Sequence, residues 1–216
     1  HGGGNTVCEL IEEPLELLSE AVNNLGYQKE VKFAMDVAAS EFYGQGKYVV
    51  RGKRMSAGEL SDVYAELAKK YPLISIEDPF HQEAFKDFAS LTKRMKSKVQ
   101  VVADDLTVTN SQRIREAIKA KSASCLLLKV NQIGTLSESL DASQLAKRAG
   151  WNMMVSHRSG ETENHFISDL AVGMATQQIK AGAPARGERT SKYNQLLRIE
   201  EKLGAKANVC GKDCWK

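Results

Sequence analysis

The sequence predicts an α/β fold in which parallel strands alternate with helices, and two observations support this. Six short apolar runs recur along the chain, each bounded by polar or turn residues and each too short for a buried helix. They cover residues 31–35, 71–76, 99–103, 125–128, 151–155 and 175–179. The longer stretches between them carry apolar residues at helical spacing. Strands and helices that alternate in this way form a parallel sheet with helical crossovers.

The helices are predicted from that spacing, in chain order. They cover residues 10–25, 59–70, 111–121, 136–149, 162–174 and 188–203. Gly26 supplies an end for the first helix, because glycine readily adopts the left-handed conformation found there. Ser111 is expected to cap the first turn of the third. The basic run over 93–98 has no interleaved aromatic residues, so it is interpreted as a solvated helix end.

Composition limits the class of protein. With 216 residues, 42% hydrophobic and 26% charged, the chain can form one sizeable core, and we expect one domain over residues 1–216. A net charge of +3 is too weak to indicate a nucleic-acid partner. No apolar stretch approaches the roughly 20 residues of a membrane span, and no signal peptide opens the chain. Four cysteines without CxxC spacing, Cys125 among them in an apolar run, favour a reduced, cytoplasmic protein.

A charged or catalytic-type residue follows each predicted strand, directly or after one serine. These residues are Asp36, Glu77, Asp104, Lys129, His157 and Lys180. A single carboxylate at a strand end is most often a helix cap or a surface charge. The carboxyl ends of the strands of a parallel barrel meet on one face, however, so six such residues in series predict one shared site.

The residue types in this series suit metal and phosphate chemistry. Three carboxylates, Asp36, Glu77 and Asp104, are hard oxygen ligands of the kind that Mg²⁺ prefers. A lysine beside a divalent cation has a lowered pKa, so one lysine can act as a neutral general base. Arg158 and Ser159 offer a forked cation and a hydroxyl to a phosphate. The second acid after two of the strands, Asp78 and Asp105, is expected to support the site or cap a helix rather than bind metal.

Several long runs of the chain resemble enolase, from about residue 10 to about residue 205. They are DVAASEF from Asp36, SIEDPF from Ser75, ADDLTVTN from Ala103, LLLKVNQIG from Leu126, SHRSGE from Ser156, IKAGAP from Ile179 and KYNQLLRIEE from Lys192. The resemblance implies a TIM-type (β/α) barrel of the enolase type. The chain would hold six of its eight strands and lack the N-terminal α+β domain, so residues 1–216 are expected to form part of the C-terminal barrel domain.

The resemblance also implies a reaction, the Mg²⁺-dependent dehydration of 2-phosphoglycerate to phosphoenolpyruvate, and a homodimer for the full-length protein. Asp36, Glu77 and Asp104 match the Mg²⁺ ligands. Lys129 matches the base that removes the C2 proton, while Lys180 and the metal stabilise the resulting dianion. The residues implied to contact substrate are Ser156, His157, Arg158, Ser159, Lys180, Glu77 and Asp104, with His157 near the leaving hydroxyl.

One departure from the family pattern leaves two interpretations open. An Asp-Glu-Gly-Gly loop precedes the first helix in enolases and takes part in protonating the leaving hydroxide, whereas His1 falls at its glutamate position here. The chain is therefore either part of a carbon–oxygen lyase, with the activity of the isolated chain left open, or a non-catalytic, enolase-derived structural or interaction module in a larger assembly. The sequence upstream in the transcript would distinguish the two.

Overall fold

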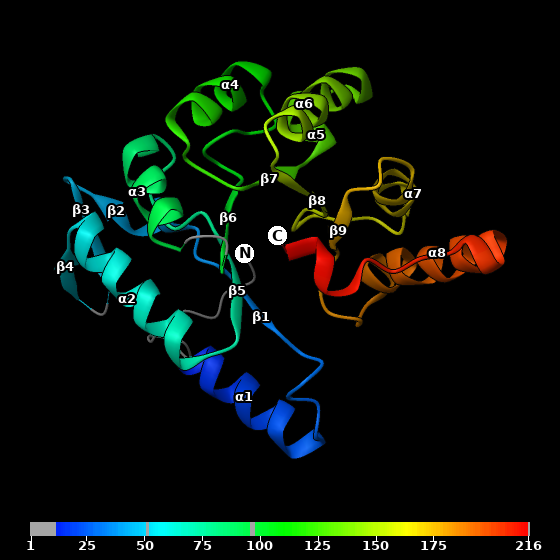
Figure 1. Cartoon of the computed structure of the whole chain (residues 1–216), viewed down its shortest axis with the longest axis horizontal. Coiled ribbons are helices and arrows are strands. Elements are labelled where there is room, and N and C mark those ends of the chain that lie inside the picture. Colours follow the sequence, from blue (N-terminus) through cyan, green and yellow to red (C-terminus); the bar gives the residue numbers. More distant parts are fainter. Residues whose placement is uncertain (1–11, 51, 96–97, 216) are drawn as a thin grey trace.

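A six-stranded parallel sheet is the centre of the fold. The computed structural model describes residues 12–50, 52–95 and 98–215. The strands are β1 (Phe33–Asp36), β5 (Leu73–Glu77), β6 (Gln100–Ala103), β7 (Cys125–Leu128), β8 (Asn152–Ser156) and β9 (Gln177–Lys180). They lie side by side in this order, and every pairing is parallel. Figure 1 shows the sheet curling into an open arc with the long helices on its outer side, which confirms the predicted α/β barrel arrangement in six-stranded form.

The helices follow the predicted alternation. They are α1 (Glu13–Leu25), α2 (Ala57–Lys70), α3 (Phe85–Met95), α4 (Ser111–Ala120), α5 (Val130–Ile133), α6 (Leu136–Arg148), α7 (Phe166–Gly173) and α8 (Gly187–Leu203). The predicted helices are confirmed with shifted bounds, except that residues 10 and 11 of the first lie outside the described residues. The start of α7 moves furthest, from 162 to 166. The prediction left α3 and α5 out. The basic residues Lys93 and Arg94 do lie in the last turn of α3, where their positive charges interact favourably with the negative end of the helix dipole.

Local capping explains where several helices begin and end. Gly26 has φ +77° and closes α1, as its conformational freedom predicts. At the start of α2, Ser56 and Glu59 form a reciprocal capping box. The prediction for Ser111 was wrong, because the extended residue before α4 is Asn110. Its side-chain oxygen accepts hydrogen bonds from the next turn, and Ser111 is already helical.

No strand was predicted between residues 37 and 58, whereas the structure has three short strands there. A small antiparallel sheet forms from β2 (Tyr43–Gly44), β3 (Lys47–Val50) and β4 (Lys53–Met55). These strands are too short to show a clear alternating pattern. Tyr48 is buried, lies against Phe80, and accepts a hydrogen bond from the amide of His81 at 3.0 Å. The small sheet therefore supports the segment that follows β5.

The core lies on both faces of the main sheet. All residues of β6 and β7 are buried, and apart from Gln100 they are all apolar. The thiol of Cys125 is buried with them. At the amino ends of the strands the interior is polar. The amides of Gln100 and Gln178 pair with each other, and Gln178 Nε2 also donates to the carbonyl of Cys214 at 2.7 Å. That bond holds the C-terminal turn η3 (Gly211–Trp215) inside the arc (Figure 1).

Two further short turns are η1 (Ala39–Phe42) and η2 (Gly204–Lys206). Across the described ranges, none of the helices combines the length and apolar character that crossing a membrane requires.

Candidate active site

The carboxyl ends of the strands surround one cavity of about 530 Å³. Five of the six predicted strand-end residues line it, namely Asp36, Asp104, Lys129, His157 and Lys180. The sixth, Glu77, is 4% exposed and is joined to the others through Lys180. Ser156, Arg158 and Ser159 also line the cavity, so the structure brings every predicted site residue to one place.

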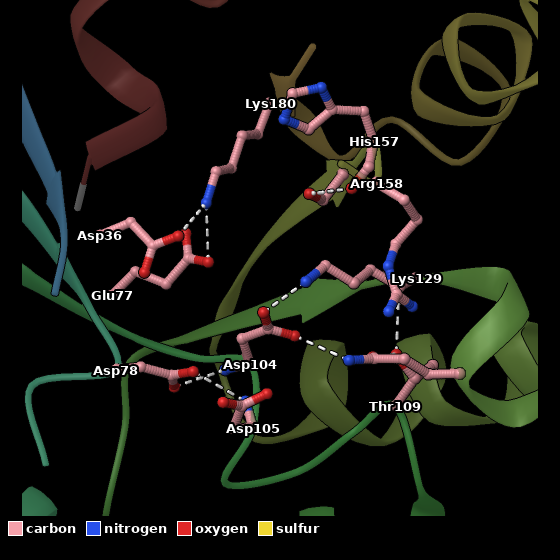
Figure 2. A network of polar contacts seen from close by, with 12 residues as sticks. Asp36, Glu77, Asp78, Asp104, Asp105, Thr109, Lys129, His157, Arg158 and Lys180 are labelled. Carbon is pink, nitrogen blue, oxygen red and sulfur yellow. Dashed lines mark hydrogen bonds and ion pairs between the residues drawn. The ribbon is translucent and has the colours of Figure 1, made fainter. Parts of the chain in front are cut away.

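Lys180 joins the two ends of the open sheet. Its Nζ lies 2.7 Å from Asp36 Oδ2 and 2.8 Å from Glu77 Oε1, as Figure 2 shows. Asp36 ends β1 and Lys180 ends β9, the two outermost strands of the sheet. The curl of the sheet is therefore what allows this contact, and the contact in turn links the two edges across the mouth.

Burial dominates the electrostatics of this cluster. Burial raises the pKa of Glu77 to about 7, with Lys180 opposing the rise and Asp36 adding to it. Burial lowers the pKa of Lys180, but Glu77 and Asp36 outweigh this, so the pKa is raised overall. With carboxylates as its direct partners, Lys180 is held in its charged form. The lowered lysine pKa predicted beside a divalent cation applies to the metal-bound site and stays a prediction.

A second lysine–carboxylate pair forms between Lys129 and Asp104. The carboxylate of Asp104 also accepts from Gln132 Nε2 at 2.8 Å, and Gln132 in turn accepts from the hydroxyl of Thr109 at 2.8 Å. The hydroxyl of Thr109 accepts from the amide of Lys129 at 3.0 Å, which closes a ring of contacts around the pair (Figure 2). The aspartate and the lysine are thus fixed relative to one another. Gln132 stands in the LLLKVNQIG run but was not singled out.

Asp78 holds the backbone at the end of β6 in place. Its carboxylate accepts hydrogen bonds from the amides of Asp104 at 3.0 Å and Asp105 at 2.9 Å. Burial, followed by the charge of Asp104, raises the pKa of Asp78 well above its usual range. Asp78 has φ +44° and Thr109 has φ +55°, left-handed values that are uncommon for residues other than glycine. Such strained positions are typical of functional sites.

Two sets of carboxylate oxygens could hold a hard divalent cation. Those of Asp78, Asp104 and Asp105 lie within 4.8 Å of one another, and no other acidic, histidine or cysteine trio in the described part of the chain does. The predicted set of Asp36, Glu77 and Asp104 shares only Asp104 with it. Asp36 and Glu77 nevertheless each direct one oxygen at the same point, the Nζ of Lys180. Two oxygens that converge on one cationic atom are suited to converge on a metal ion as well.

The loop after β8 is held by helix α8. The guanidinium of Arg189 donates to the carbonyls of Arg158 at 2.8 Å and Ser159 at 3.0 Å, and lies 2.5 Å from His157 Nδ1. Burial, then Arg189 and Lys180, lower the pKa of His157. Arg189, Arg186 and Glu41 also line the cavity, and none of the three was predicted as a site residue. Both arginines follow β9, the last predicted strand, closely in the sequence, and that position was the signal that could have identified them.

The chain is similar to one described protein family and to several curated proteins. Residues 1–216 match the protein family described as "Enolase, C-terminal TIM barrel domain". The chain is 56% identical over 203 residues to "Enolase" of Methanocaldococcus jannaschii, which covers 94% of this chain and 48% of that protein. It is 53% identical over 215 residues to "Enolase" of Thermococcus gammatolerans, which covers 98% of this chain and 50% of that protein. It is also 53% identical over 209 residues to "Enolase 2" of Hevea brasiliensis, which covers 93% of this chain and 47% of that protein. The chain therefore spans about half the length of the curated relatives it matches.

Proposed function

The chain belongs to the enolase family through its C-terminal TIM barrel domain, and from this premise we propose that its cavity serves the dehydration of 2-phosphoglycerate to phosphoenolpyruvate. The reaction is a carbon–oxygen lyase step. The C2–H and C3–O bonds break, a C2–C3 double bond forms, and water leaves. The observation that supports this most is the convergence of two lysine–carboxylate pairs and a cationic loop on one cavity.

The loop after β8 is proposed to bind the phosphate group. Arg158 presents a guanidinium and Ser159 a hydroxyl at the cavity, and both suit phosphate oxygens. The backbone of this segment is held by Arg189, and Ser156 is buried beside it with its hydroxyl donating to the carbonyl of His157 at 2.9 Å. A rigid backbone fixes the position of the phosphate and so the distance from C2 to Lys129.

Asp36, Glu77 and Asp104 are proposed to hold Mg²⁺, because they are hard ligands and Asp36 and Glu77 already direct oxygens at one point. When bound, Mg²⁺ would supply positive charge to the substrate carboxylate as C2 loses its proton. Lys180 stands beside the same two carboxylates and adds a second positive charge there. Concentrated positive charge of this kind stabilises a developing dianion in the transition state.

Lys129 is proposed to take the C2 proton. Its amine is oriented by Asp104, which Gln132 holds in place. A general base must be neutral when it accepts the proton, and this is favoured once the charge of Asp104 is shared with a metal. His157 lies across the cavity and is proposed to contact the leaving hydroxyl. We further propose that the full-length protein is a cytoplasmic homodimer. His1, at the position of the family's acidic residue, lies outside the described residues.

The test is phosphoenolpyruvate formation from 2-phosphoglycerate, followed with Mg²⁺ and again with a chelator. Metal-dependent turnover that falls about 10²–10⁴-fold in Lys129→Ala would support the proposal, because that is the usual contribution of a general base. Lys119→Ala is the matched control, since Lys119 is exposed on α4. Absence of turnover in a folded chain that binds Mg²⁺ would contradict the proposal for this chain.

A second candidate function is a non-catalytic structural or interaction role. The observation in its favour is that, among the described residues, β1 and β9 each pair with one strand only. An open strand edge readily pairs with another chain. The assay above separates the two functions, because a structural module would keep its fold and show no metal-dependent turnover.

A further inference from the structure

We propose that Arg189 is a positioning residue that holds His157 neutral, with its proton on Nε2 and its Nδ1 as an acceptor. The inference deepens the proposed function and rests on it, because it defines what His157 can do beside the leaving hydroxyl. A ring held in this form can donate a hydrogen bond through Nε2. It cannot accept a proton at Nδ1 while Arg189 occupies that nitrogen.

The contact between the two side chains fixes the proton assignment. Arg189 Nη1 lies 2.5 Å from His157 Nδ1. A guanidinium has only donors and stays charged throughout the ordinary pH range, so Nδ1 must be the acceptor. A neutral imidazole carries a single proton, which then lies on Nε2.

The guanidinium cannot easily turn away, because it is anchored to the two residues that follow His157. Nη1 also donates to the carbonyl of Arg158, and Nη2 donates to the carbonyl of Ser159. Three acceptors on three successive residues match the planar fork of an arginine, which a lysine does not possess. The Arg189 side chain is 15% exposed, so these contacts are largely shielded from water.

Gly182, in the segment after β9, provides the space for this arrangement. A Cβ at this position would lie 2.9 Å from Cδ of Arg189 and 3.1 Å from Cε1 of His157. Gly182 also has φ +86°, which residues with a side chain rarely adopt. Tyr193, one turn after Arg189 on α8, donates its hydroxyl to the carbonyl of Gly182 and so holds the segment in place.

Two further cations that face His157 act in the same direction as Arg189. Lys180 at the end of β9 and Lys129 at the end of β7 both disfavour a charged ring. The carboxylate of Glu161, on the same loop as His157, opposes these two lysines. Burial is the largest influence and also disfavours the charge, so a neutral ring agrees with the geometry.

The test is a long-range ¹H–¹⁵N spectrum of the ¹⁵N-labelled chain, recorded as a function of pH, with His157→Gln to assign the signals. In the unsubstituted chain, we expect unprotonated Nδ1 and protonated Nε2 for His157 at neutral pH. In Arg189→Met, we expect a tautomer mixture and a titration midpoint that moves up toward 6.5, the ordinary value, because one cause that lowers the pKa is gone. Arg198→Met is the control, as Arg198 lies on the same helix and makes an exposed contact with Gln195.

The inference is overturned if Nδ1 carries the proton in the unsubstituted chain, or if the tautomer and midpoint are unchanged in a folded Arg189→Met variant. Should Arg189→Met not fold, the unsubstituted spectrum still decides the tautomer. Gly182→Ala then takes its place, with the same expected changes, because the added methyl displaces Arg189 from His157. Neither the tautomer nor the titration midpoint depends on catalytic turnover. A chain that shows the expected spectrum without activity would contradict the proposed function and leave the tautomer assignment standing.

Discussion

Lys192 and Glu161 form an ion pair in which the lysine is completely buried, with 2.6 Å between Nζ and Oε2. The lysine comes from α8 and the glutamate from the loop after β8. Lys192 also donates to the carbonyls of Thr162 at 2.5 Å and Glu188 at 2.7 Å. Glu161 accepts from the amide of Arg158 at 3.2 Å. A saturated buried ammonium of this kind fixes the proposed phosphate-binding loop against α8.

Replacing Lys192 by methionine is expected to lower the free energy of unfolding by about 3–5 kcal/mol, because Glu161 then keeps a shielded charge without its partner. The measurement is urea-induced unfolding followed by circular dichroism. Lys202→Met, at an exposed position on the same helix, is the control and is expected to stay within about 0.5 kcal/mol of the unsubstituted chain. Equal stability of the two variants would show that the buried pair contributes nothing.

The same pair predicts how stability depends on pH. Burial raises the pKa of Glu161, but hydrogen bonds from Lys192 and the Arg158 amide outweigh it, so the pKa is lowered from its ordinary value of 4.5. The folded chain therefore releases this proton more readily than the unfolded chain. The stabilisation is therefore complete above pH 4.5, the ordinary pKa of the unfolded chain. It is lost as the pH falls through the lower pKa that Glu161 has in the folded chain.

Glu161→Gln isolates that contribution. The difference in free energy of unfolding between the unsubstituted chain and Glu161→Gln is expected to be largest at neutral pH and to shrink below 4.5. Urea titrations at a series of pH values measure this difference directly. A difference that stays constant, or that grows as the solution becomes more acidic, would mean that the charge of Glu161 does not stabilise the fold.

Mg²⁺ is expected to raise the melting temperature, since a ligand that binds only the folded state stabilises it by about 2.7 kcal/mol at 100 times its Kd. The shift should be lost in Asp36→Asn and Glu77→Gln, because these carboxylates are the proposed ligands. Asp141→Asn removes an exposed carboxylate on α6 and should keep the full shift. Differential scanning fluorimetry with and without a chelator makes the comparison, and an undiminished shift in Asp36→Asn would exclude Asp36 as a ligand.

Gln178→Ala is expected to release the C-terminal turn and to destabilise the chain. The substitution removes the hydrogen bonds that Gln178 makes with the amide of Gln100 and with the carbonyl of Cys214. Each lost hydrogen bond is expected to cost about 0.5–1.5 kcal/mol. Hydrogen exchange over residues 207–215, together with thermal unfolding, measures both effects. Gln195→Ala removes an exposed amide contact with Asp169 and should change neither.

Much of the secondary structure could be predicted because it depends on local patterns. The buried strand Cys125–Leu128 was recognised from four apolar residues in a row, and the end of α1 from Gly26. The small sheet β2–β4 could not, because its strands are too short for a period to appear and are stabilised by Tyr48 packing against Phe80. Asn110 was missed as a cap because two neighbouring residues both have suitable side chains, and only the backbone conformation selects one.

The sequence by itself determined that acids and lysines follow successive strands, and hence that they gather at one end of a parallel sheet. The tertiary structure alone decided which of them meet. Lys180 contacts Asp36, 144 residues earlier, only because the sheet curls until its outer strands face each other. Arg189 reaches His157 only because α8 packs beside the loop after β8 and Gly182 leaves room. A hydropathy pattern is set by residues that are close in the sequence, whereas these contacts depend on the position of whole helices and strands in space.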